Sequence, residues 1–150
     1  MLKLRTACLG LALFAANFCV WSDSAVTTII GDTEVVLPPL GLPNIRALDI
    51  EENGATSAAA QKVEPQCKRF RLSEADAMDY LRMAQVVTEH DYLHALDWSP
   101  CFASGVVYFQ GGLTGVWGAH QYRAGSLKLS DGRELYLYCP KCKSRGFSKP

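Results

Sequence analysis

The sequence lacks an excess of either charge: its 150 residues include 15 Lys and Arg against 15 Asp and Glu, a formal net charge of zero. A chain without net positive charge has little with which to neutralise phosphates, so we expect no nucleic-acid partner. It also lacks a Gly-x-Ser-x-Gly elbow, a Gly-x-x-x-x-Gly-Lys phosphate loop and a recognisable pair of catalytic carboxylates. We therefore predict a protein that is not an enzyme and that holds no cofactor.

No apolar run is long enough to cross a membrane. The longest, Cys8–Trp21, has 14 residues and is broken by Asn17, whereas a spanning helix needs roughly 20. Lys3 and Arg5 precede this run and the small residue Ser24 follows it, which is typical of a secretory signal peptide. We predict that residues 1–24 are a signal peptide, with a retained anchor as the alternative, and that the protein is periplasmic or secreted. The chain has no Asn-x-Ser/Thr sequon, which favours a bacterial periplasm over a eukaryotic secretory route.

Aromatic residues and cysteines are both missing from residues 25–66. Such a segment buries little area per residue, so we expect it to be weakly ordered, with a linker at about residues 51–60. Its one structured candidate is Val26–Leu37, where β-branched residues flank Gly31-Asp32 and predict a possible hairpin. Residues 67–150 hold twelve of the fifteen aromatic residues and form the predicted folding unit.

One helix is predicted in this unit. Ser73 is a suitable N-cap, and the acidic residues Glu74 and Asp76 suit the positive end of a helix dipole. Apolar residues then recur at helical spacing as far as Val87. The pattern predicts a helix from about Glu74 to Val87.

After the helix the sequence changes to the two-residue period of β-strands. Cys101–Gln110 and Leu113–Tyr122 are two such runs, and Gly111-Gly112 between them predicts a two-residue hairpin loop. That loop would place Val106 opposite Trp117, an aromatic against a β-branched residue.

A second hairpin is predicted around Asp131-Gly132. A three-residue loop is preferred there, because it places Leu127 opposite Leu135 and Lys128 opposite Glu134. The expected fold class is α+β, with one helix packed on a curled antiparallel meander of about four strands and stabilised by disulfides.

Two of the six cysteines lie in the predicted signal peptide, which leaves Cys67, Cys101, Cys139 and Cys142. Four cysteines in an exported chain are expected to be oxidised, and they allow three pairings. We predict Cys67–Cys101, which would pin the helix to the sheet, and Cys139–Cys142, the more reducible bond across a short loop. Two alternatives give the Cys139-Pro140-Lys141-Cys142 motif a chemical role: a redox dithiol, or half of a zinc site completed by Cys67 and Cys101.

His90 and His94, with Asp97 nearby, could hold a metal ion if they shared one face of a helix. The intervening sequence shows no clear helical stripe, and on a strand residues four apart lie about 13 Å from one another. We therefore expect histidines of the surface or the core, and no metal site.

Tyr136 and Tyr138 alternate with Leu135 and Leu137 along the last predicted strand. If the leucines face the core, the tyrosines form an amphipathic stripe suited to binding a protein partner. The alternative is that residues 25–66 cover this stripe.

The segment Asp97-Trp98-Ser99-Pro100-Cys101, then glycine-rich strands, then Tyr138-Cys139-Pro140-Lys141-Cys142, resembles small exported proteobacterial proteins to which no activity is assigned. The resemblance spans about residues 67–147 and implies a periplasmic setting. Taken with the features above, it predicts a small exported non-catalytic binding protein of the bacterial periplasm, such as an inhibitor or the immunity-type partner of a toxin. The alternative is a thiol-redox or zinc-binding protein that uses Cys139 and Cys142.

Overall fold

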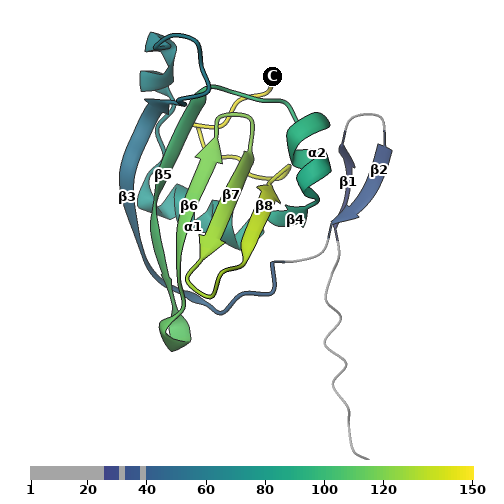
Figure 1. Cartoon of the computed structure of the whole chain (residues 1–150), viewed down its shortest axis with the longest axis vertical. Helices are drawn as coiled ribbons and strands as arrows, with labels where there is room; N and C mark the ends of the chain where they lie inside the picture. The colour runs from purple at the N-terminus through teal and green to yellow at the C-terminus, as the bar shows by residue number, and fades with distance from the viewer. Residues whose placement is uncertain (1–25, 31–32, 38–39) are drawn as a thin grey trace, which may run out of the picture.

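A six-stranded antiparallel sheet forms the centre of the structure, in the strand order β3-β5-β6-β7-β8-β4 (Figure 1). Its strands are β3 (Ile45–Thr56), β4 (Gln85–Val87), β5 (Cys101–Phe109), β6 (Thr114–His120), β7 (Ala124–Leu129) and β8 (Glu134–Tyr138). The helical elements are the α-helices α1 (Glu74–Met83) and α2 (Glu89–His94) and the short 3-10 turns η1 (Pro65–Arg69) and η2 (Gln110–Gly112).

This is a computed structural model, and it describes residues 26–30, 33–37 and 40–150. The predicted signal peptide lies outside the described residues. Within the described ranges, no helix is long and apolar enough to span a membrane. The α+β class is confirmed in outline, but six strands and two α-helices in one described unit replace the predicted four strands and one helix.

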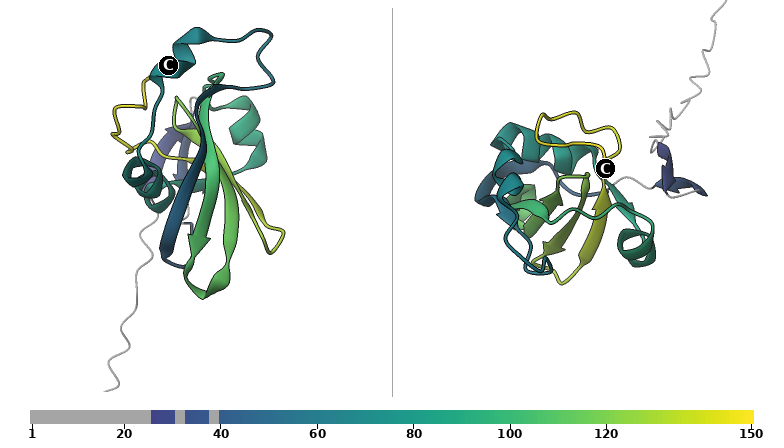
Figure 2. Two further views of the ribbon diagram at one scale, coloured as in Figure 1. Left: turned by 90° about the vertical axis from the view of Figure 1, so that its left-hand side faces the viewer. Right: turned by 90° about the horizontal axis from the view of Figure 1, so that it is seen from above.

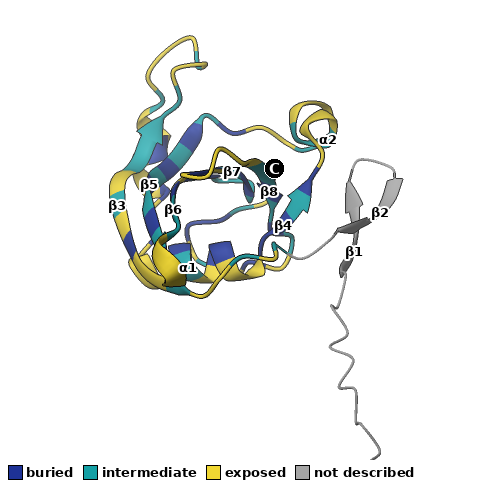
Figure 3. Cartoon of the chain, turned by 60° about the horizontal axis from the view of Figure 1, so that its bottom comes forward, coloured by how far each residue is buried: buried dark blue, intermediate teal, exposed yellow. Residues whose placement is uncertain are grey.

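The sheet curls, and its inner face holds the core (Figures 2 and 3). Alternate residues of the central strands point inward and are almost fully buried: Ala103, Val107, Phe109, Trp117, Ala119, Leu127, Leu129 and Leu137. Helix α1 closes this side with Tyr80 and Leu81, both at most 2% exposed. The C-terminal tail adds Phe147, whose ring lies 5.5 Å from that of Tyr80.

Helix α1 begins where the sequence predicts and ends earlier. The Ser73 hydroxyl accepts the backbone N–H of Asp76, and the Asp76 carboxylate accepts the backbone N–H of Ser73, so both orphan donors are satisfied. The predicted continuation to Val87 is wrong, because Gln85–Val87 is the edge strand β4, hydrogen-bonded to β8. The apolar residues keep their helical spacing as far as Val87, but backbone hydrogen bonds to β8 make Gln85–Val87 a strand.

The first hairpin differs from its predicted register by one residue. Trp117 lies opposite Gly105, and Val106 lies opposite Val116. The loop has three residues, Gln110–Gly112, closed by a hydrogen bond from the backbone N–H of Phe109 to the carbonyl oxygen of Leu113. The shift matters because it places Trp117 on the buried inner face and leaves Val116 on the outer one.

The second hairpin has the predicted register and loop. Leu127 lies opposite Leu135 and Lys128 lies opposite Glu134. Gly132, at the end of the three-residue loop, has a φ of 92°, which favours glycine at this position.

Residues 45–56 form the long edge strand β3, where the sequence predicts a weakly ordered segment running into a linker. The strand pairs with β5 along its whole length. Near its end, the Asn53 side chain donates to the carbonyl oxygen of Leu72 (2.8 Å) and accepts from the backbone N–H of Leu72 (3.0 Å). The linker prediction fails because it rested on side-chain area, whereas an edge strand is held largely by backbone hydrogen bonds. The folded unit therefore begins before Cys67.

Residues Val26–Ile30 (β1) and Thr33–Leu37 (β2) pair as antiparallel strands, at the place where the sequence predicts a possible hairpin. Their predicted turn, Gly31-Asp32, lies outside the described residues. The pair forms a two-stranded sheet of its own and does not extend the six-stranded sheet.

Both predicted disulfides are present, Cys67–Cys101 and Cys139–Cys142. The first joins η1 to the start of β5, and its cysteines are 34 positions apart in the sequence. The second joins cysteines that are 3 positions apart. Because the longer loop restricts the unfolded chain more, replacing Cys67 and Cys101 together by Ser should lower the free energy of unfolding by roughly 3–4 kcal/mol. The matched Cys139→Ser, Cys142→Ser variant should lose only about 2 kcal/mol. Urea denaturation measures both, and equal losses would contradict this order.

Gly125 makes the close contact between β7 and helix α1. A Cβ atom there would collide with the Gly118 carbonyl oxygen and the Tyr80 hydroxyl, so Gly125→Ala should lower the free energy of unfolding by about 1–3 kcal/mol. Gly118→Ala is the matched control, since the nearest atoms to its Cβ would lie 3.9 and 4.0 Å away. Urea denaturation followed by tryptophan fluorescence compares the two, and a Gly118→Ala loss as large as that of Gly125→Ala would contradict the argument.

Candidate partner-binding surface

The outer face of the sheet is the main exposed surface of β5 and β6. Residues on this side alternate with the buried ones, and they are Phe102, Ser104, Val106, Tyr108, Thr114, Val116, Gly118 and His120. Val116 lies near the middle and is 57% exposed. Helix α1 packs on the opposite side of the sheet, so within the described chain this part of the outer face has no helix over it (Figure 2).

Helix α2 covers the other end of the outer face, over β8 and β4 (Figure 1). The ring of Tyr92 lies 4.9 Å from that of Tyr136, and the Tyr136 hydroxyl donates to the carboxylate of Glu89 at 3.0 Å. Tyr136 and Tyr138 both remain partly exposed. The tyrosine stripe therefore faces outward with Leu137 buried beneath it, and α2 is the element that partly covers it. The role of the two tyrosines in binding a partner stays a prediction.

The sequence argument that separated His90 from His94 is wrong, because residues 89–94 form helix α2 and not a strand. The Thr88 side chain begins the helix by accepting the backbone N–H of Asp91 at 3.0 Å. The two imidazole rings lie 4.9 Å apart on the exposed side of the helix. In the described ranges, no cluster of three or more His, Cys, Asp or Glu side chains is arranged to hold a metal ion.

A small pocket of about 200 Å³ lies where the segment after α2 meets the end of β6. Its lining residues are Tyr92, Leu93, Leu96, Asp97, Trp98, His120 and Ala124. Trp98 is 55% exposed and Leu93 is 58% exposed, so two large apolar side chains stand open to solvent at one small cavity. Sequence reasoning did not select either residue, although an exposed tryptophan is a common centre of a binding site.

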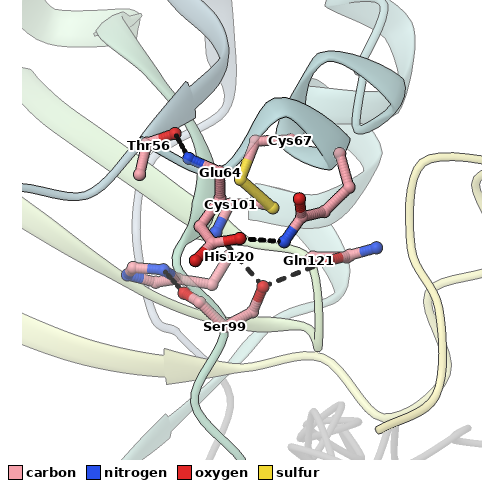
Figure 4. Close-up of a disulfide and its surroundings, with 8 residues drawn as sticks. Thr56, Glu64, Cys67, Ser99, Cys101, His120 and Gln121 are labelled. Atoms are coloured by element: carbon pink, nitrogen blue, oxygen red, sulfur yellow. Dashed lines mark hydrogen bonds between the residues drawn. A yellow bond between two sulfur atoms is a disulfide. The ribbon is translucent and has the colours of Figure 1, made fainter. Parts of the chain in front are cut away.

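His120 is the last residue of β6 and lines this pocket. It is hydrogen-bonded to Ser99, which in turn is hydrogen-bonded to Cys101 of the Cys67–Cys101 disulfide (Figure 4). Its Nδ1 lies 3.0 Å from the carbonyl oxygen of Ser99, so this nitrogen carries the proton and donates it. The buried Ser99 hydroxyl accepts the backbone N–H of Cys101 and donates to the Gln121 side chain. Burial lowers the pKa of His120, and the hydrogen bond to Ser99 opposes this shift only in part. At neutral pH the ring is uncharged, which leaves Nε2 as an acceptor.

Acidic groups border the outer face on both sides. On β3, the exposed carboxylate of Asp49 accepts from the Tyr108 hydroxyl (3.2 Å) and that of Glu52 accepts from the Ser104 hydroxyl (3.1 Å). On the other side, α2 and the segment after it carry Glu89, Asp91 and Asp97. Residues 83–122, which include α2, β5 and β6, contain no Lys or Arg. Two exposed basic side chains lie at the same face: Lys128 of β7 is opposite Val116, and Arg46 of β3 is near Tyr108. The face and its borders therefore carry more carboxylates than basic side chains, although the whole chain is neutral.

The Cys139–Cys142 disulfide lies elsewhere, at a groove of about 920 Å³ between α1 and the C-terminal tail. Cys139 is 0% and Cys142 is 5% exposed. Arg123 fixes the tail here: its guanidinium donates to the carbonyl oxygens of Cys142 and Ser148, each at 2.9 Å. No helix follows the cysteine pair in residues 143–150, so the motif lacks the helix N-terminus that lowers a thiol pKa in redox dithiols.

Comparison with protein-family models, with curated proteins and with solved structures finds no match to this chain. The site is therefore interpreted from its own geometry.

The partly buried His120 makes stability depend on pH. In the unfolded chain histidine titrates near 6.5, and the folded pKa is lower. Between those two pKa values the unfolded chain binds more protons than the folded chain. The free energy of unfolding is therefore highest above about pH 6.5 and falls as the pH drops below that value. Urea denaturation at a series of pH values from about 8 to about 5 should show this decline.

His120→Gln should flatten the decline, because the neutral side chain removes the titrating group. His94→Gln, on the exposed side of α2, is the matched control and should retain the wild-type slope. An unchanged slope in His120→Gln would contradict the assignment of the His120 ring as the titrating group.

Proposed function

We propose that the protein is a non-catalytic binding protein, exported to the bacterial periplasm or secreted, which holds a basic protein partner on the outer face of its sheet. The observation that carries the proposal is the open face of β5 and β6, with exposed Val116 at its centre and carboxylates on both sides. An apolar centre with a charged rim is the usual anatomy of a protein–protein interface. Because carboxylates outnumber basic side chains around this face, the complementary surface is positive.

In this proposal the partner contacts side chains of the outer face and does not add a strand to the sheet. Strand β3 is interrupted by register shifts at three points along its pairing with β5. Its exposed charges include Arg46, Asp49, Glu51 and Glu52. Bulges and charges both obstruct pairing with another strand. The free edge of β3 is thus unsuited to the addition of a partner strand, which favours the face over the edge.

An inhibitor or an immunity-type partner of a toxin is the form of binding protein that we favour. Such proteins act by occupying a surface of the target, and a rigid face serves this better than a mobile one because less entropy is lost on binding. Two disulfides, and a core that continues from α1 to the C-terminal tail, support a rigid scaffold. The disulfides also fit an oxidising compartment such as the periplasm.

The alternative, a thiol-redox or zinc-binding protein using Cys139 and Cys142, has less support. The two sulfur atoms are joined in a nearly buried disulfide, and no helix follows to activate a thiol. A four-cysteine zinc site would also need both disulfides to be reduced. Assay of protein purified from the periplasm should therefore find neither free thiols nor bound zinc. Detection of either would favour the alternative.

Val116→Glu tests the proposed face directly. It places a carboxylate in the apolar centre without touching the core, since Val116 is 57% exposed. We expect capture of the partner from periplasmic extract to fall by roughly tenfold or more, because the apolar contact at the centre of the interface is lost and the new carboxylate, although opposite Lys128, must be desolvated when the partner binds. Quantitative mass spectrometry of the captured proteins measures this effect, and raised salt should release the partner.

Val63→Glu is the matched control. Val63 is 78% exposed, between β3 and η1 and outside the proposed face. This variant should capture the partner as the wild type does. If Val116→Glu captures the same proteins in the same amounts as Val63→Glu, the outer face is not the binding surface.

A further inference from the structure

We infer that the pocket beside Trp98 receives a single arginine side chain from the protein partner, as the anchor of the interface. This inference rests on the proposed function and names the chemical group that the partner presents. Three observations carry it: the size of the pocket, the exposed Trp98 in its lining, and two lining residues, Asp97 and His120, that can accept hydrogen bonds.

The size of the pocket limits what it can hold. About 200 Å³ is room for one side chain and is below the usual range of roughly 300–1,000 Å³ for pockets that bind small molecules. The wall is formed largely by Tyr92, Leu93 and Leu96, which would pack against the aliphatic part of a long side chain. Leu93 and Trp98 are more than half exposed, and an occupant would cover them.

The polar groups of the pocket accept hydrogen bonds and favour positive charge. Asp97 contributes a carboxylate, and His120 contributes an Nε2 that makes no hydrogen bond within the described structure. Nδ1 of His120 is occupied by the carbonyl oxygen of Ser99, so the ring can present only its acceptor nitrogen to a ligand. Asp97 forms no salt bridge in the described structure. The nearby cation Arg123 donates instead to the carbonyl oxygens of Cys142 and Ser148.

Arginine matches this arrangement better than lysine. Its planar guanidinium carries five donors in a fixed fork, so it can bond the carboxylate and the imidazole nitrogen together, and it stacks well on an indole ring. The ammonium group of lysine is a strongly hydrated point charge and loses more on entering a partly apolar pocket. Arginine and tryptophan are also the residue types most often found as interface anchors.

The experiment uses N-acetyl-arginine methylamide as the probe, titrated into the isotope-labelled exported protein and followed by NMR. We expect saturable shifts of the Trp98 indole N–H and of residues around His120, with a dissociation constant in the millimolar range typical of one side chain. The citrulline analogue has the same shape without charge, and it should bind at least about tenfold more weakly, as should the lysine analogue.

Two variants assign the contacts. Asp97→Asn should weaken binding of the arginine probe by about tenfold, and Trp98→Ala should abolish saturable binding. Both residues are exposed, so neither change is expected to disturb the core. Glu74→Gln, which removes an exposed carboxylate from α1 on the far side of the sheet, is the matched control and should bind as the wild type does.

Equal binding of the arginine and citrulline probes, or shifts that avoid Trp98, would overturn the inference. Its failure is distinguishable from failure of the proposed function. If Val116→Glu loses the partner while the arginine probe does not enter the pocket, the outer face binds the partner and the arginine anchor is wrong.

Discussion

The contact of Tyr80 with the start of β7 and with Arg123 just before it is the constraint on which the rest of the structure depends. Gly125 has no side chain, and the Tyr80 hydroxyl of α1 and the Gly118 carbonyl oxygen occupy the space that a Cβ atom there would need. Burial raises the pKa of the Tyr80 hydroxyl well above its usual range, so it stays protonated and donates to the carbonyl oxygen of Arg123 at 3.3 Å. The backbone N–H of Cys139 donates to that same oxygen, and the Arg123 guanidinium holds the C-terminal tail. One close approach thereby joins helix, sheet and tail on the inner side.

Because these contacts all lie on the inner side, the two faces of the sheet have different roles. Trp117, Leu127 and Leu137 fill the inner face and are at most 1% exposed. The outer face carries partly exposed residues on β5 and β6, and among the described residues α2 covers it toward β8. Because the core does not need the outer face, that face can be shaped by recognition of a partner. The proposed binding surface, its acidic border and the Trp98 pocket all lie on this side.

The candidate site was only partly accessible to sequence reasoning. Alternation along β8 correctly places Leu137 inside and the two tyrosines outside, because the two-residue period of a strand is a local property. Trp98 and His120 come together only in the folded chain, since 22 positions separate them and nothing local signals the contact. The metal argument on His90 and His94 failed for a related reason. A six-residue helix is too short to be stable alone and depends on packing against Tyr136, which lies far along the chain.

By itself, the sequence determined the features that depend on a few residues lying close to one another in the chain. These are the Ser73 cap, the three-residue loop at Gly132 and the pairing of Cys139 with Cys142, with Cys67 and Cys101 left for each other. The tertiary structure alone decided that residues 45–56 are a strand, that α1 ends at Met83, and that Trp117 lies opposite Gly105. Each of these depends on backbone pairing with a strand distant in sequence, where hydrogen bonds to the neighbour outweigh the weak local preferences that a sequence pattern records.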